Sequence, residues 1–343
     1  MLSYEKFKEV VTERLSELIK QDYPDIDITE HSIAKHNRSE DTLLFSRQHD
    51  GMGVSPTLYF SHVYGDYVRN GDVDFYINQC YLQLRERMEY TEEVRKAFYD
   101  QSALANRITF ELIHTEQNKE LLSTVPHREF QDLSIIYNCT FKTENLEGNA
   151  CVTNGLAEFL NVTEEELYAY AYENTKRVHK PIVRPLEDVL LYAMFKEHEG
   201  MNLEEIPERD GTPLLSIYML TNSEEKRGAV SMLYTEELEK LAEKLDSDLY
   251  IMPASVDMVL VTNTHEHSPE TLANIVYEMN LQTLMLEDRL SNQVYHYNRQ
   301  TQEISLATNT EHTMLTDDYE TEEAEGIVET EAEEGMSMGM GVC

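Results

Sequence analysis

Basic residues are scarce in this sequence, whose 343 residues include 28 Lys and Arg against 65 Asp and Glu, a net charge of -37. A protein that binds nucleic acid directly needs clustered Lys and Arg to displace the counterions of the phosphate backbone. We therefore expect no direct nucleic-acid partner. Eleven acidic residues lie in residues 311–343, so residues 1–310 keep 54 acidic against 28 basic residues, a net charge of -26. Repulsion should keep this body monomeric or weakly associated unless a basic partner compensates it.

Cysteines and long apolar runs are also few. The four cysteines, Cys80, Cys139, Cys151 and Cys343, form no Cys-x-x-Cys pair and lack the dense spacing of a secreted disulfide scaffold. The opening stretch MLSYEKFKEV has charges where a signal peptide has its apolar core. The longest apolar run, VLLYAMF at residues 189–195, is far shorter than the roughly 20 residues that span a bilayer. The sequence thus predicts a cytoplasmic protein with reduced thiols and no membrane insertion.

Motifs of the common enzyme classes are absent from the sequence. The thirteen glycines are scattered and form no phosphate-binding loop, nucleotide fingerprint or Gly-x-Ser-x-Gly elbow. Kinase, dehydrogenase and hydrolase functions therefore have no motif to support them, and we predict no cofactor.

Hydrophobic residues make up 41% of the sequence, which is sufficient for the cores of two folded domains in a chain of this length. We assign residues 1–145 to an amino-terminal α+β domain that begins with a helix capped by Ser3. The polar stretch at residues 142–149 marks its end. Strands are predicted at 42–47, 57–62 and 133–141, and helices near 72–88 and 91–105.

A second α+β domain is predicted at residues 150–307. Thr163 and Glu166 form a capping box. In the helix that follows, Leu167, Tyr170 and Ala171 form an apolar face that Tyr168 and Tyr172 would widen to more than half of the circumference, and we interpret this stripe as a core or helix contact. Strands and helices then alternate, which favours a mixed or antiparallel sheet with helices packed on one side. The predicted strands are at 214–222, 228–234, 248–255, 256–263, 293–299 and 302–307, and the helices between them carry Leu238, Leu241, Ala242 and Leu245, and Leu272, Ile275, Val276 and Met279.

The last segment, residues 308–343, is rich in acidic residues, contains Met and Gly, and has no apolar periodicity. A segment of this composition cannot bury enough apolar surface to offset the entropy of ordering it. We predict a disordered acidic tail.

The stretch THEHSPE places two histidines, His265 and His267, in a loop between a strand and a helix. Their spacing differs from the i, i+4 spacing of a His-Glu-x-x-His zinc helix, and the sequence marks no third ligand. Ser268 is a natural helix cap, and Pro269 suits the first helical position, so helix initiation explains the second half of the motif. We interpret the histidines as exposed loop residues, with a weak metal site as the alternative.

The stretch TKRVHKPIVRP contains the one concentration of basic residues in the sequence. Cations stabilise the carboxyl end of a helix, and the prolines at 181 and 185 discourage further helix, so a helix end and a linker explain the cluster. The alternative is a site for an anion or an acidic partner. Its residues are Lys176, Arg177, His179, Lys180 and Arg184.

Residues 217–261 and 290–304 contain a set of features that occur together: Thr221-Asn222, Gly228-Ala229, Leu233, the amphipathic helix, Tyr250-Ile251-x-Pro253 and the stretch LSNQVYHYNRQTQEI. In these features they resemble an uncharacterised bacterial family, a domain of unknown function frequent in anaerobic Gram-positive bacteria and often encoded on mobile elements. No activity follows from this resemblance, which implies a fold and a mobile-element setting.

One position departs from the pattern of that family. There, the proline equivalent to Pro253 is followed by Ser-Ser, an aliphatic residue and a His-Glu pair. Here Asp257 and Met258 occupy the last two positions. If the pair were a catalytic dyad, this chain would have lost it, which favours a structural or binding role.

These observations favour a non-catalytic cytoplasmic protein that binds a protein partner, acting for a mobile element on a host protein. One alternative is an enzyme of unrecognised type that assembles His and carboxylate side chains by folding. Another is an acidic mimic of DNA, whose carboxylates imitate a backbone with one charge per ~1.7 Å. A pocket that gathers titratable groups would favour the enzyme, and a flat acidic face would favour the binding protein.

Overall fold

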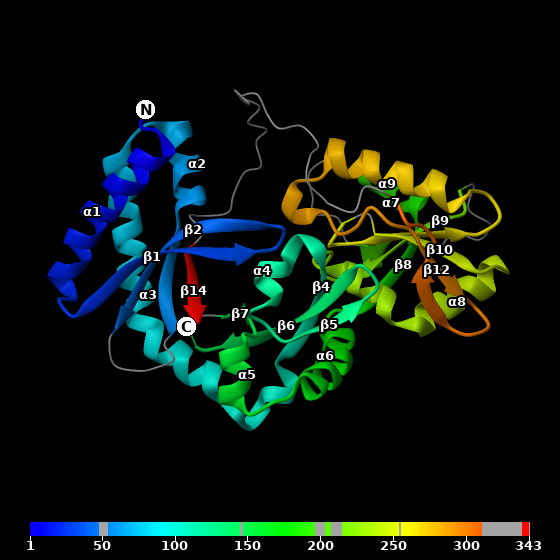
Figure 1. The fold of residues 1–343 in the computed structure, drawn as a ribbon, viewed down its shortest axis with the longest axis horizontal. Helices are drawn as coiled ribbons and strands as arrows, with labels where there is room; N and C mark the ends of the chain where they lie inside the picture. The colour runs from blue at the N-terminus through cyan, green and yellow to red at the C-terminus, as the bar shows by residue number, and fades with distance from the viewer. Residues whose placement is uncertain are drawn as a thin grey trace. The chain divides into compact units, whose positions relative to one another are not determined.

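The computed structural model describes residues 1–47, 54–144, 147–195, 203–206, 215–253, 255–310 and 338–342. The described residues form two compact units (Figure 1). The first contains Met1–Leu104, Cys139–Ala150 and the strand at Met338–Val342, and the second contains Ala105–Asn138 and the described residues from Cys151 to Thr310. That residues 1–145 and 150–307 are two independently folding domains stays a prediction. In the structure, residues 105–138 pack with the second unit.

The first unit packs three helices on an antiparallel sheet in the order β1-β2-β3-β14. Ser3 caps the first helix by accepting a hydrogen bond from the Lys6 amide, as predicted. The core is formed by one face of each helix, and on α1 this face is Phe7, Val11, Leu15 and Ile19. Its elements are α1 (Tyr4–Asp22), β1 (Ile26–Lys35), β2 (Arg38–Arg47), β3 (Val54–Tyr59), α2 (Phe60–Asn70), α3 (Val73–Tyr99) and β14 (Met338–Val342).

A small four-stranded sheet follows, in the order β4-β6-β5 with β7 paired to β6. β4 is therefore an edge strand. The register of β5 on β6 pairs His127 with Ile136 and Phe130 with Leu133. The elements are β4 (Ile108–His114), α4 (Lys119–Leu122), β5 (His127–Phe130), β6 (Leu133–Lys142) and β7 (Glu147–Cys151), preceded by a 3-10 helix at Gln101–Asn106 and interrupted by another at Glu116–Asn118.

The largest sheet has six strands in the order β13-β12-β10-β11-β9-β8, and every pair is antiparallel. The α+β class and the antiparallel sheet are confirmed. Its strands are β8 (Pro181–Pro185), β9 (Ile217–Asn222), β10 (Leu249–Met252), β11 (Val259–Asn263), β12 (Tyr295–Asn298) and β13 (Glu303–Leu306).

Helices lie on both faces of the six-stranded sheet, whereas the alternating pattern predicted helices on one side. On one face, α9 packs Leu272, Ala273 and Val276 on Met252, and α7 packs Val189 on Met219. On the other, Lys244 of α8 lies over the ring of Tyr218, a neighbour of Met219 on the strand. Successive strand residues point to opposite faces, so α8 covers the second face. The α-helices from residue 154 to residue 283 are α5 (Asn154–Leu160), α6 (Glu164–Val178), α7 (Leu186–Phe195), α8 (Thr235–Leu245) and α9 (Pro269–Thr283).

One predicted strand is wrong. Residues 228–234 were expected to be a strand, but Gly228–Leu233 form a 3-10 helix, η4. Gly228 packs so closely that an added Cβ would lie 2.2 Å from Thr221 Oγ1 and 2.5 Å from the Asp257 carbonyl oxygen. The Ala229 amide donates to the Val256 carbonyl instead of to a neighbouring strand. This close packing turns an apolar run away from the sheet. Two further 3-10 helices lie at Leu203–Glu205 and Leu286–Asp288.

The segment predicted as a disordered tail contains one described strand. β14, Met338–Val342, pairs antiparallel with β3, with Met338 opposite Leu58 and Val342 opposite Val54. In sequence, Met and Val alternate with Gly here, a period of two over a stretch too short to stand out in an acidic segment. Residues 311–337 lie outside the described residues. Among the helices that are described, none is both long and apolar enough to cross a membrane.

Candidate functional site

Helix α6 is held along the edge of the small sheet by its own polar side chains. The predicted capping box is present: the Glu166 amide donates to Thr163 Oγ1 at 3.3 Å, and the Thr163 amide donates to Glu166 Oε2 at 2.9 Å. Near the other end, Asn174 donates to the Ile108 carbonyl and Thr175 accepts from the Phe110 amide. These two bonds occupy backbone groups of edge strand β4 and fix the rotation of the helix.

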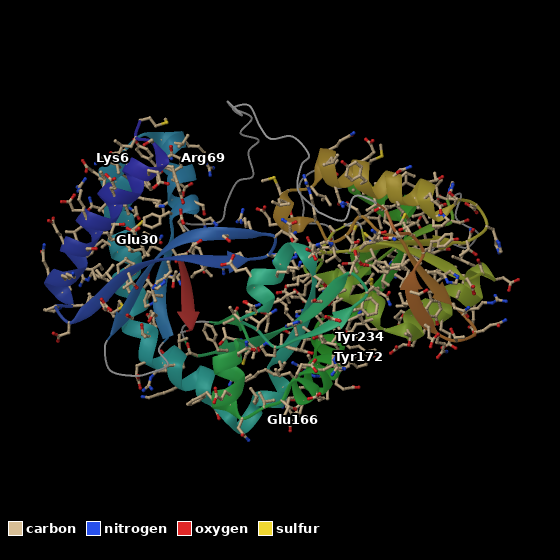
Figure 2. All side chains as sticks on the ribbon, in the orientation of Figure 1. Lys6, Glu30, Arg69, Glu166, Tyr172 and Tyr234 are labelled. Atoms are coloured by element: carbon tan, nitrogen blue, oxygen red, sulfur yellow. The ribbon has the colours of Figure 1, made fainter. Side chains whose placement is uncertain are left out.

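This rotation gathers four aromatic rings from three elements, which we call the ring cluster: Phe110, Tyr168, Tyr172 and Tyr234. Phe110 stacks on Tyr168 at 6.1 Å between ring centroids, and Tyr172 meets Tyr234 edge to face at 5.3 Å. Phe110 and Tyr234 are buried, whereas Tyr168 and Tyr172 are half-buried. Figure 2 shows the labelled Tyr172 and Tyr234 side by side. The cluster presents part of an aromatic core to solvent.

Two cations of the chain lie over rings of this cluster. The Arg128 guanidinium is 4.0 Å from the Tyr168 ring centroid and makes two hydrogen bonds to Glu164, at 2.9 and 2.8 Å. The Lys176 ammonium is 5.5 Å from the Tyr234 ring centroid and forms an ion pair with Glu236. In both places, one cation contacts both a tyrosine ring and a carboxylate.

The electrostatics of the cluster follow from its burial. Burial raises the pKa of Tyr234 and Tyr172, and the nearby Glu173 carboxylate adds to both shifts. The Tyr234 hydroxyl is buried without a hydrogen-bond partner among the described residues. Burial alone would raise the pKa of Glu164, but hydrogen bonds from Arg128 and the Tyr137 hydroxyl outweigh it and lower that pKa. Glu164 therefore remains charged, and both tyrosines remain neutral at ordinary pH.

The structure spreads the predicted basic cluster over several separate contacts. Lys176 belongs to the ring cluster, and Arg177 donates to the Asn174 side chain. His179 ends α6, and burial lowers its pKa. Arg184 donates to the carbonyls of Leu203 and Val183. Lys180 is exposed, and its carbonyl accepts from the Ser223 amide. These contacts are those of a helix end and a strand, and the anion site stays a prediction.

The loop with His265 and His267 exposes both side chains. Its backbone is shaped by Asn263, whose side-chain oxygen accepts from the amides of His265 and Glu266. Ser268 caps α9 by accepting from the Thr271 amide, as predicted. No group of three or more His, Cys, Asp or Glu side chains suited to a metal ion is found in the described part of the chain.

Asp257 and Met258, the two positions where a His-Glu pair was expected from the resemblance, have structural contacts. An Asp257 carboxylate oxygen accepts from the Arg227 amide at 2.7 Å, and its carbonyl accepts from Thr221 Oγ1 at 2.6 Å. Met258 packs on the apolar cluster that contains Met219. Arg227 has a φ of 52°, a left-handed conformation that the Asp257 contact helps to hold. These residues shape a turn.

The structure contains a polar cluster around Asp132 that was not predicted from the sequence. Ser291 Oγ donates to Asp132 Oδ2 at 2.6 Å, and the Tyr295 hydroxyl donates to Oδ1. His114 Nε2 is 3.9 Å from the same carboxylate, while its Nδ1 accepts from the Gln117 amide. Ser291 thus bonds the carboxylate and not the imidazole, so Ser291 is not arranged as a nucleophile with His114 as its base. The cluster ties the β5–β6 turn to β12, and no local motif could have revealed it.

Comparison with known proteins gives a family and no activity. The chain belongs to a family of unknown function (DUF5688), which matches residues 4–299. The match covers most of both compact units, without β14 and β13, and every residue of the ring cluster. No curated protein and no solved structure matches the chain significantly.

Proposed function

We propose that this chain is a non-catalytic, cytoplasmic binding protein that contacts a protein partner through the ring cluster. The observation that carries the proposal is the half-exposed pair Tyr168 and Tyr172, held by a buried aromatic base and flanked by Arg128. Tyr and Arg are enriched where binding energy is concentrated in interfaces, because they bury large areas and also form polar contacts. The mobile-element setting that we expect for this family makes a host protein the first partner to examine.

Charge favours a protein partner over nucleic acid. Exposed aromatic rings can also stack on unpaired bases, but single strands are held mainly by a positively charged groove. Residues 1–310 have a net charge of -26, so a phosphate backbone would be repelled on approach. A protein surface with basic residues would be attracted.

The test begins with affinity capture by the full chain in extracts of its native cell. Each retained protein is then purified, and its Kd for the chain is measured by calorimetry. Tyr172→Ala should weaken binding by about tenfold or more, because an anchor ring is removed. Tyr170→Ala is the matched control: it removes the same side chain from the same helix, two positions away and so on a different side.

The control should leave the Kd within about twofold, since residues outside the contact contribute little. The proposal fails if the purified partner binds the Tyr172→Ala protein as tightly as the parent. It also fails if both substitutions weaken binding equally, because the effect would then come from α6 as a whole.

A further inference from the structure

The ring cluster repeats one arrangement, in which a tyrosine ring, a carboxylate and a cation lie together. At the start of α6, the ring is Tyr168, the carboxylate Glu164 and the cation Arg128. At its end, the ring is Tyr234, the carboxylate Glu236 and the cation Lys176. A cation is attracted both to the negative face of the ring and to the carboxylate.

A third tyrosine and carboxylate lie between these two, and no cation from the described residues accompanies them. Tyr172 is half-buried and touches both Tyr168 and Tyr234. Glu173 is exposed, close enough to influence both Tyr172 and Tyr234 electrostatically, and forms no ion pair within the described part of the chain. The ring of Tyr234 contacts that of Tyr172, and the buried Tyr234 hydroxyl lacks a hydrogen-bond partner among the described residues. An unpaired buried hydroxyl is unfavourable, and a donor brought close to it would relieve that.

We propose that Tyr172 and Glu173 receive an arginine side chain from a basic segment of the partner, which would complete the third ring–carboxylate–cation arrangement. This inference rests on the proposed function, because it names the chemistry of the partner at the same surface. The negative body of the chain would attract such a segment, and the exposed carboxylate would orient it.

Arginine fits this position better than lysine. The planar guanidinium stacks on aromatic faces and can bond a carboxylate through two N–H groups at once. Arg128 shows both contacts at the neighbouring site, with its guanidinium 4.0 Å from the ring centroid and two bonds to Glu164. Lys176 lies farther from its ring, at 5.5 Å.

The test uses synthetic peptides, so that it does not depend on identifying the natural partner. A glycine-serine peptide that contains several arginines is titrated into the full chain and followed by calorimetry. The same peptide with citrulline in place of arginine keeps the shape and loses the charge. We expect the citrulline peptide to bind the parent chain at least about tenfold more weakly than the arginine peptide does. The arginine peptide should likewise bind the Tyr172→Ala protein at least about tenfold more weakly than it binds the parent.

Matched variants separate the site from general acidity. Glu173→Gln should weaken the arginine peptide by about tenfold, and Tyr172→Phe, which keeps the ring, should stay within about threefold of the parent. Glu243→Gln removes one exposed carboxylate from α8 and should change the Kd less than twofold. Equal weakening by Glu173→Gln and Glu243→Gln overturns the inference, as does equal binding of the citrulline peptide.

The two proposals can fail separately. If a purified partner depends on Tyr172 but binds the Glu173→Gln protein unchanged, the binding surface stands and the arginine site is refuted. If the arginine peptide behaves as expected while a cellular partner is indifferent to Tyr172, the proposed function fails and the arginine site stands.

Discussion

Gly228 is a residue whose lack of a side chain decides the local fold. An added Cβ would lie 2.2 Å from Thr221 Oγ1, 2.5 Å from the Asp257 carbonyl oxygen and 2.8 Å from the Asn222 amide nitrogen. Two of these atoms belong to the backbone and cannot move aside alone. We predict that Gly228→Ala lowers the free energy of unfolding by about 3 kcal/mol, measured by urea denaturation.

A second glycine provides the control for this prediction. Gly65 lies inside α2, and an added Cβ would meet nothing within 4 Å. Gly65→Ala should therefore raise the free energy of unfolding by about 0.5 to 1 kcal/mol, because alanine is favoured in a helix interior. Similar effects of the two substitutions would contradict the steric explanation at Gly228.

His114 should make stability depend on pH. Burial lowers the pKa of its imidazole in the folded chain, although Asp132 and Glu116 oppose the shift. The unfolded chain therefore binds this proton more readily. The free energy of unfolding should fall as pH decreases from about 6.5, the ordinary value for histidine, toward the lower folded pKa. Urea midpoints measured across this range for the parent and for His114→Asn would show the dependence.

The His114→Asn protein should lose part of this acid sensitivity. His179, whose pKa burial also lowers, would supply the remainder. His265→Asn, which changes an exposed loop histidine, should leave the pH dependence as it is in the parent. The same slope for His114→Asn and His265→Asn would contradict the role of burial.

At the scale of elements, the cap of α9 should matter more than the histidines before it. Ser268→Ala removes the acceptor of the Thr271 amide and should lower the free energy of unfolding by about 1 kcal/mol. Replacing His265 and His267 together by Ala should change it little, because both are exposed. A zinc-dependent rise in the unfolding midpoint that the double variant lacks would restore the metal site.

Elements with signals at their own ends could be predicted from the sequence. The helices beginning after Ser3, Thr163 and Ser268 all have the caps that were expected. By contrast, the helices predicted at 72–88 and 91–105 are mainly one helix, α3, because the polar residues between them include no Gly or Pro to end it. The strand predicted at 57–62 ends at Tyr59, and α2 begins at Phe60.

The candidate site was only half visible in the sequence. Tyr168 and Tyr172 share α6, so their spacing could be read directly. Their partners Phe110, Arg128 and Tyr234 come from β4, β5 and the end of η4. Such contacts depend on how an edge strand meets a helix, which is set by the tertiary bonds of Asn174 and Thr175. No local pattern records those bonds.

At the scale of the whole molecule, the second unit needs strands that the predicted domain limit leaves out. Residues 150–307 contain α6 but lack β4, and they contain Ser291 and Tyr295 but lack Asp132. We predict that the fragment 105–310 unfolds cooperatively and that the fragment 150–307 does not, because the latter exposes apolar surface and unpaired polar groups.

Thermal unfolding followed by far-ultraviolet circular dichroism would compare the two fragments. A single cooperative transition of fragment 150–307, similar to that of fragment 105–310, would show that the predicted domain folds independently. Absence of a transition in both would show that the second unit needs the first.

The buried phenols have a consequence at alkaline pH. The chain has 21 tyrosines and no tryptophan, and burial raises the pKa of Tyr137, Tyr234 and Tyr295 in the folded state. Above about pH 10, the unfolded chain releases phenolic protons that the fold retains, so stability falls as pH rises. Tyrosinate absorbance should then rise in two phases, one immediate and reversible from exposed rings and one that appears only as the fold opens. The rate of the second absorbance phase therefore reports the rate at which the folded chain unfolds.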